Sequence, residues 1–205
     1  MKTIYIYIFD TFANWEIANI LEAISWQSKL KEPIYQIKTV SDKREPVKSL
    51  CGITVIPDCS LDEIDIKNAA ALLLPGGVWN VQAQSVVLDL AKSFLENKKV
   101  VGAICGATLA LADCGLLNGR EHTSNSLEYL QGLSVNYKGE VLYKTEKAVK
   151  SDNLITACSA GGLLWGKLIL EALAAYPSDV IEAWYNYYST GDARFYGKLI
   201  GLLNK

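Results

Sequence analysis

Cys105 is the residue whose setting points most directly to chemistry. It follows an apolar run at 100–104 and precedes a segment with helical spacing, and its neighbours are small (Ala103, Gly106 and Ala107). A turn that leads from a strand straight into a helix strains its central residue and tolerates only small neighbours, which is the pattern of a nucleophile elbow. Such a turn lifts the side chain above the carboxyl ends of the strands, where α/β sheets bind ligands, and aims a helix N-terminus at it. We therefore expect a nucleophilic thiol with a pKa below the free value of about 8.5. A small buried hydrophobe would fit the same local pattern.

The counts of cysteine and histidine limit the other chemistry available. The chain has five cysteines without close CxxC pairing, and its first residues do not resemble an export signal. We therefore expect free thiols in a reducing, cytoplasmic environment. There is a single histidine, His122, which excludes zinc sites of the HExxH kind and any mechanism that needs two histidines. We expect no metal and no other cofactor.

The composition is that of a globular chain without an excess of positive charge. Of its 205 residues, 50% are hydrophobic and 20% charged, and the formal net charge is −2. Binders of nucleic acid or anionic lipid concentrate Lys and Arg on one face, so we expect neither partner. The longest uncharged run, 68–88, is broken by Pro75, Gly76 and Gly77. That interruption excludes a helix of about 20 apolar residues that could cross a membrane.

Apolar segments of two kinds alternate along the chain. Short β-branched runs predict strands, and apolar residues at helical spacing predict helices, the first of them with Asn14 as its N-cap. The expected strands are 3–9, 34–40, 52–56, 70–74, 99–104, 122–124, 141–149 and 154–157, and the expected helices are 14–24, 60–66, 84–96, 107–112 and 162–174. This alternation predicts a mostly parallel sheet covered by helices on both sides, a three-layer α/β/α sandwich.

The chain shows no internal repeat, linker or low-complexity tract, so we expect one domain over residues 1–205. The segment 178–205 carries six aromatic residues. We expect it to form a helical appendage packed on the domain, because a stacking platform for bases would need a basic groove as well.

Several motifs, in a consistent order, resemble the ThiJ/PfpI superfamily, which comprises cysteine-bearing relatives of class I glutamine amidotransferases. The resemblance covers about 4–173 and rests on Phe9-Asp10 followed by Glu16, Pro57-Asp58, Leu72-Leu73-Leu74-Pro75-Gly76-Gly77, Ala103-Ile104-Cys105-Gly106-Ala107, Gly115-Leu116-Leu117-Asn118-Gly119-Arg120 and Leu154-Ile155-Thr156-Ala157. It implies a flavodoxin-like fold and a homodimer.

The resemblance also implies a site. In the family the elbow cysteine is reactive, a glutamate of the first helix contacts its sulfur, and backbone amides form an oxyanion-hole-like pocket. These residues would be Cys105, Glu16, Gly106 and Gly77, with Gly76 shaping the turn; Trp79 and Asn125 would line the pocket. Without the resemblance, Glu16 is simply a first-turn residue that complements a helix dipole. If Glu16 reaches the sulfur, the two groups should share one proton, with protonated Glu16 donating to a thiolate.

Two departures from the family pattern concern activity. Members described as intracellular peptidases have a histidine directly after the cysteine, where this chain has Gly106, and another common family histidine falls at Asn125. In a strand, His122 and Asn125 would point to opposite faces. His122 therefore does not replace the family histidine that is missing at position 125. Acyl transfer therefore lacks an obvious base, and Gly106→His would be expected to raise activity.

Two further patterns have structural explanations. Gly161 to Lys167 has the spacing of a P-loop, but Leu168 stands where a magnesium-binding Ser or Thr belongs, so helix packing explains it better. Cys158 follows a strand and is interpreted as a buried structural thiol; the alternative is a resolving thiol for Cys105.

Two functions fit these residues. The first is a cysteine-dependent hydrolase, protease-like or amidase-like, that acts through Cys105 on a small carbonyl or amide substrate which the sequence does not identify. The alternative is a non-enzymatic sensor of oxidative stress in which Cys105 is oxidised to a stabilised sulfinate.

Overall fold

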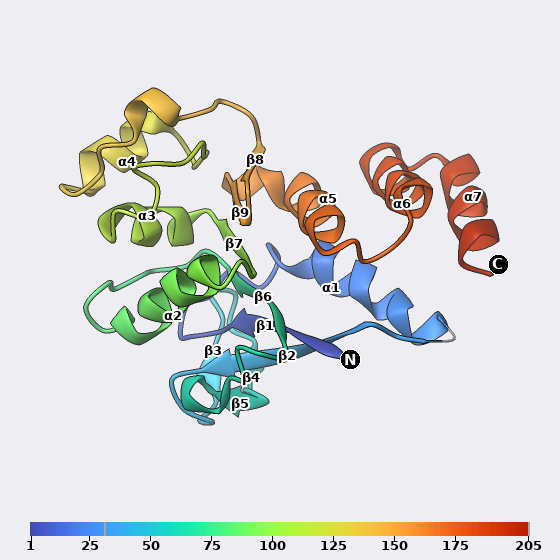
Figure 1. Cartoon of the computed structure of the whole chain (residues 1–205), viewed down its shortest axis with the longest axis horizontal. Helices are drawn as coiled ribbons and strands as arrows, with labels where there is room; N and C mark the ends of the chain where they lie inside the picture. Colours follow the sequence, from blue (N-terminus) through green and yellow to red (C-terminus); the bar gives the residue numbers. More distant parts are fainter. Residues whose placement is uncertain (31, 205) are drawn as a thin grey trace.

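A seven-stranded sheet runs through the molecule in the computed structural model, which describes residues 1–30 and 32–204 (Figure 1). The strand order is β5-β2-β1-β6-β7-β9-β8, and every neighbouring pair is parallel except β8 and β9. The strands are β1 (Lys2–Tyr7), β2 (Tyr35–Ser41), β5 (Cys59–Ser60), β6 (Ala69–Leu74), β7 (Val100–Ile104), β8 (Ala148–Ser151) and β9 (Leu154–Ala157). The predicted mostly parallel sheet is confirmed.

Helices cover both faces of this sheet. Helices α1 (Ala18–Ser25) and α5 (Gly162–Leu173) lie side by side on one face, whereas α2 (Ser85–Glu96) and α3 (Gly106–Asp113) cover the other (Figure 1). Every residue of β6 and β7 is buried. A parallel strand buried on both faces is apolar throughout, which explains why these two segments show no polar alternation. The architecture is the expected three-layer α/β/α sandwich.

Three of the parallel strands end next to residues that could take part in a reaction or shape a reactive site. Leu74 pairs with Ala103, and Ile104 pairs with Ala157, so β6, β7 and β9 end at neighbouring points of one sheet edge. The residues that follow these strands include Gly76, Cys105 and Cys158. The sheet register therefore places Cys105 between two neighbouring chain turns.

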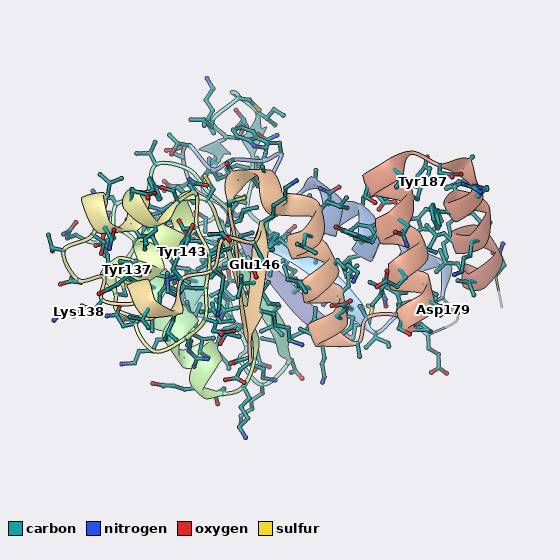
Figure 2. All side chains as sticks on the ribbon, turned by 90° about the horizontal axis from the view of Figure 1, so that it is seen from above. Tyr137, Lys138, Tyr143, Glu146, Asp179 and Tyr187 are labelled. Atoms are coloured by element: carbon teal, nitrogen blue, oxygen red, sulfur yellow. The ribbon has the colours of Figure 1, made fainter. Side chains whose placement is uncertain are left out.

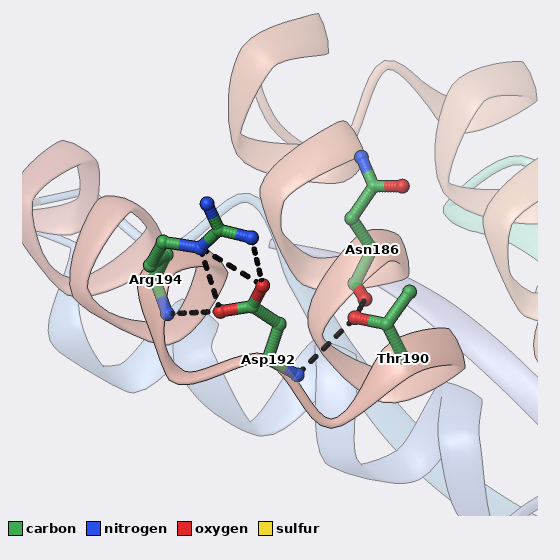
Figure 3. A network of polar contacts seen from close by, with 4 residues as sticks. All are labelled: Asn186, Thr190, Asp192 and Arg194. Carbon is green, nitrogen blue, oxygen red and sulfur yellow. Dashed lines mark hydrogen bonds and ion pairs between the residues drawn. The ribbon is translucent and has the colours of Figure 1, made fainter.

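The C-terminal segment forms two helices, α6 (Ser178–Thr190) and α7 (Ala193–Leu203). Gly191, with φ +70°, ends α6, and the carboxylate of Asp192 caps α7 by accepting from the Arg194 N–H at 2.9 Å (Figure 3). Glu22 of α1 ties this pair of helices to the sheet domain, because its carboxylate accepts from the indole of Trp184 in α6 at 2.6 Å. The same carboxylate also accepts from the indole of Trp26 at 2.5 Å.

Several expected elements differ in extent. Asn14 is not a helix N-cap: α1 begins at Ala18 after a turn, and the Asn14 side chain accepts from the Cys51 thiol instead. The strand expected at 122–124 is only an isolated bridge between His122 and Tyr143. Short 3-10 turns at Leu61–Glu63 and Glu140–Leu142 replace the helix expected at 60–66 and part of the strand expected at 141–149.

Other short elements carried no usable sequence pattern. These are α4 (Leu127–Leu133), the 3-10 turns Trp26–Lys29 and Ser159–Gly161, and the strand β3 (Val47–Lys48), which forms an antiparallel hairpin with β4 (Thr54–Val55). Elements of two to seven residues are shorter than the window in which hydrophobic periodicity is informative. No helix within the described residues is long and apolar enough to cross a membrane.

Strand β7 is packed so tightly that a single added methyl group should lower the stability of the protein. A Cβ atom on Gly102 would lie 2.8 Å from the Trp165 ring and 2.9 Å from Leu73. Gly102→Ala should therefore lower the free energy of unfolding by about 1–3 kcal/mol, the usual cost of overpacking a core. Gly132→Ala is the matched control, because nothing lies within 4 Å of that position in α4. Urea unfolding would measure both, and equal stability of the Gly102→Ala and wild-type proteins would contradict this account of the packing.

Candidate active site

Cys105 occupies the turn between β7 and α3. Its backbone has φ +56° and ψ −122°, which is unusual for a residue with a side chain. The conformation is fixed on both sides: the Cys105 N–H donates to the Ala157 carbonyl at 3.0 Å, and its own carbonyl accepts from the Thr108 hydroxyl at 2.6 Å. The strained elbow that the sequence predicts is therefore confirmed.

Glu16 lies against the same turn from the other side. It precedes α1 and is only 2% exposed. Its Oε2 accepts from the Gly76 N–H at 2.7 Å. A Cβ atom on Gly76 would lie 2.6 Å from Glu16 Oε2 and 3.1 Å from Cys105 Sγ, so only glycine lets the carboxyl group and the sulfur meet at this point. The other carboxyl oxygen, Oε1, is buried without a hydrogen-bond partner among the described residues.

The two groups compete for protons. Burial raises the pKa of the Glu16 carboxyl, against the lowering effect of the Gly76 N–H. Burial also raises the pKa of the Cys105 thiol, and the nearby Glu16 charge adds to that increase. The predicted thiol pKa below the free value is therefore wrong, because desolvation outweighs the donors that favour the anion. With its pKa raised, the Cys105 thiol keeps its proton at neutral pH and lies against the Glu16 carboxyl group.

Asn125 supplies a hydrogen bond to the sulfur. Its Nδ2 donates to Cys105 Sγ at 3.4 Å, and its Oδ1 accepts from the Ser159 N–H at 2.9 Å. The backbone donor fixes the orientation of the amide, so the NH₂ group faces the sulfur. An amide that donates to the sulfur favours the thiolate, but it cannot accept the proton of the Cys105 thiol. Among the described residues that contact the sulfur, only Glu16 is a base.

The backbones of two glycines and one indole ring also lie close to Cys105. The Gly106 N–H faces the Cys105 sulfur and favours its anion. A Cβ atom on Gly106 would lie 2.6 Å from the Gly77 carbonyl oxygen and 3.3 Å from the Trp79 ring. The structure thus brings Gly77, Gly106 and Trp79 together. It contradicts the expected benefit of Gly106→His, because any side chain there meets the Gly77 backbone.

His122 lies away from the sulfur, as the sequence pattern indicates. Its Nδ1 donates to the Arg120 carbonyl at 2.7 Å, so its Nε2 accepts from the Tyr137 hydroxyl at 2.7 Å. Burial lowers its pKa, and the neutral ring packs edge-on against Tyr137 and Tyr143. These tyrosines lie toward the end of the molecule opposite Tyr187 of α6 (Figure 2).

Two residues near the elbow were missed by the sequence analysis. The hydroxyl of Thr108 bridges the Cys105 carbonyl and the Ser124 hydroxyl, both at 2.6 Å. Tyr129 belongs to α4, and burial together with the charges of Cys105 and Glu16 raises the pKa of its phenol. The position of Thr108 three residues after the elbow is a usable signal in retrospect. Tyr129 had none, because α4 itself was not expected.

A groove of about 400 Å³ opens beside Asn125. Its lining includes Tyr143 and Glu146, which Figure 2 labels on the same side of the molecule, together with Lys147 and Cys158. Cys158 is half-buried there, so the prediction of a buried structural thiol is wrong in its burial. Within the described residues, no three His, Cys, Asp or Glu side chains gather as metal ligands.

Comparison with known proteins gives consistent matches. The model of the DJ-1/PfpI family matches residues 2–172. The chain is 32% identical to "Uncharacterized protease YoaZ" of Bacillus subtilis, over 100% of this chain and 99% of that protein. It superposes with a TM-score of 0.91 on a thiJ/pfpI family protein from Bacillus anthracis, at 32% identity and covering 100% and 98% of the two chains.

More distant relatives have other names. A protein named deglycase TK1284, from Thermococcus kodakarensis, is 32% identical over 51% of this chain and 64% of its own length. The DJ-1 superfamily protein Atu0886 from Agrobacterium tumefaciens superposes with a TM-score of 0.79, at 26% identity, over 94% of this chain and 100% of its own. Both protease and deglycase therefore occur among the names of similar proteins.

Glu16→Gln should lower the pKa of Cys105, because it removes a carboxylate charge from beside the sulfur while keeping the size of the side chain. Iodoacetamide should then alkylate Cys105 faster at neutral pH than in the wild type. The measurement is the pH midpoint of alkylation, followed by mass spectrometry of the Cys105 peptide, with exposed Cys114 as the internal control. A higher midpoint in Glu16→Gln would mean instead that Glu16 carries the proton and donates to a thiolate.

Proposed function

The chain belongs to the DJ-1/PfpI family, and from that premise we propose that it is a cysteine-dependent hydrolase acting on a small carbonyl or amide substrate. The contact of the Cys105 thiol with the Glu16 carboxyl over Gly76 is the observation that carries the proposal. It pairs a nucleophile with a proton acceptor at the sheet edge where α/β proteins bind ligands. The protease and deglycase names among the relatives support it.

In the first step, Cys105 Sγ forms a bond to the substrate carbonyl carbon. The thiol proton passes to Glu16, and the carbonyl π electrons move onto oxygen. Backbone N–H groups of Gly106 and Gly77 are suitably near to stabilise that oxyanion. The oxyanion then collapses, the bond to the leaving group breaks, and a thioester on Cys105 remains.

In the second step, water attacks the thioester. Glu16 is again a carboxylate once it has given its proton to the leaving group or, where that group departs as a stable anion, to water, and it then takes a proton from the attacking water. The new tetrahedral intermediate expels the Cys105 thiolate, which recovers the proton from Glu16. A carboxyl group whose pKa is raised by burial is a stronger base than an exposed one, which suits it to this exchange.

The proton relay also restricts the substrate. Asn125, which stands where relatives often have a histidine, neither takes nor gives a proton. Glu16 is enclosed beneath the sulfur and has to serve both proton transfers alone. We therefore expect leaving groups that depart as stable anions to react well and peptide amines to react slowly.

The test is p-nitrophenyl acetate, whose leaving group needs no proton. Wild type should turn it over, Cys105→Ser should not, and casein should be cleaved at background rate. Glu16→Gln should release one nitrophenolate per chain and then turn over about 10²–10⁴-fold more slowly, because water attack loses its base. Mass spectrometry should find the acetyl group on Cys105. Cys158→Ser is the control and should match the wild type; turnover that survives Cys105→Ser would contradict the proposal.

A second candidate function is oxidation sensing. The donors that face the sulfur, the Asn125 amide and the Gly106 N–H, would also bind the oxygen atoms of an oxidised cysteine. Each of two peroxide molecules would transfer one oxygen atom to Cys105 and leave as water, giving first a sulfenic and then a sulfinic acid. This function needs no base, which fits the missing histidine.

Limited peroxide should then add two oxygen atoms to the Cys105 peptide and stop there. Asn125→Ala should let the oxidation run on to the sulfonic acid, because the sulfinate loses a donor. Mass spectrometry of the Cys105 peptide, with the Cys114 peptide as control, would measure this. Oxidation of Cys114 ahead of Cys105, together with robust ester turnover, would reject the sensor in favour of the hydrolase.

A further inference from the structure

The glycine-rich run at 161–167 is not used by the proposed chemistry, and the structure gives it another role. It forms the start of α5, which lies beside α1 (Figure 1). A Cβ atom on Gly162 would lie 3.3 Å from the backbone carbonyl oxygen of Glu16. One helical turn later, a Cβ atom on Gly166 would lie 3.4 Å from the Trp184 ring and 3.8 Å from the backbone of Ile20. The first turn of α5 thus lies against the backbone of Glu16.

The backbone conformation of Gly162 does not explain why it is glycine. Its φ of −53° and ψ of −37° are ordinary right-handed helix values, which alanine adopts readily. A residue with a side chain would therefore suit this backbone at least as well as glycine does. The close approach of the Glu16 carbonyl supplies a reason for the glycine at this position.

Glu16 is contacted at both its side chain and its backbone. Its carboxyl group meets the Gly76 N–H at 2.7 Å and the Cys105 sulfur. Its backbone carbonyl lies close to Gly162. A methyl group at 3.3 Å from a backbone oxygen requires a shift of a few tenths of an ångström. When the Glu16 backbone gives way by this amount, its carboxyl group moves with it relative to the sulfur.

We infer that Gly162 is a positioning residue for Glu16, and that the bare first turn of α5 sets the distance between the Glu16 carboxyl group and the Cys105 sulfur. The inference rests on the role proposed for Glu16 in the proton exchange. Its test uses thiol alkylation and needs no substrate, so a failure of the proposed hydrolase activity would be seen separately.

The experiment compares Gly162→Ala with Gly166→Ala. Both change glycine to alanine on one face of α5, but the Gly166 position makes only ordinary van der Waals contacts. With an effective dielectric constant of about 20, moving a charge from about 4 Å by a few tenths of an ångström changes a pKa by about 0.3. Gly162→Ala should shift the pH midpoint of Cys105 alkylation by about this amount, because it changes the distance between the Glu16 charge and the sulfur. Gly166→Ala should leave the midpoint unchanged.

A double substitution separates positioning from a general disturbance. In a Glu16→Gln background there is no carboxylate charge to move, so adding Gly162→Ala should not shift the midpoint further. Thermal unfolding verifies that each variant is folded, and Gly162→Ser provides a second variant with the same Cβ atom. An unchanged midpoint in Gly162→Ala, or an equal shift with and without the Glu16 carboxylate, would overturn the inference.

Discussion

One proton shared between a buried carboxyl group and a half-buried thiol is the constraint on which the rest of this site depends. The Cys105 thiol and the Glu16 carboxyl group meet at a point where neither is fully solvated, and burial raises the pKa of both. Two adjacent anions there would be strongly unfavourable, so one group keeps a proton when the other is charged. The strained turn after β7 and the glycine at position 76 both serve this contact: one aims the sulfur, and the other leaves room for the carboxyl group.

The absence of an imidazole beside the sulfur gives the site its particular character. The Asn125 amide and the Gly106 N–H only donate hydrogen bonds to the sulfur. Proton acceptance therefore falls to Glu16, whose position is fixed by Gly76 and by the first turn of α5. In a histidine-based site the ring moves protons to and from solvent with ease. An enclosed carboxyl group exchanges protons mainly with its immediate neighbour, which favours reactions that need few external proton transfers.

The sequence was informative where geometry follows from local patterns. Small residues around Cys105 predicted the elbow, and apolar strands predicted the parallel sheet. The contact of Glu16 came from family resemblance, since its local pattern indicates only a helix start. The direction of the Cys105 pKa was wrong because burial depends on the whole fold, whereas the helix N-terminus is visible locally. Tyr129 and the obstruction around Gly106 arise from chain segments far apart in sequence, so no local pattern revealed them.

The most direct test of this account is the infrared S–H stretching band of Cys105. The difference spectrum between the wild type and Cys105→Ala at neutral pH isolates this thiol from the other four cysteines. The account predicts an S–H band at neutral pH, shifted to lower frequency by donation to the Glu16 carboxylate and moved back toward the frequency of an ordinary thiol in Glu16→Gln. The absence of any S–H band from the wild-type difference spectrum would show a thiolate beside a protonated carboxyl group and would contradict it.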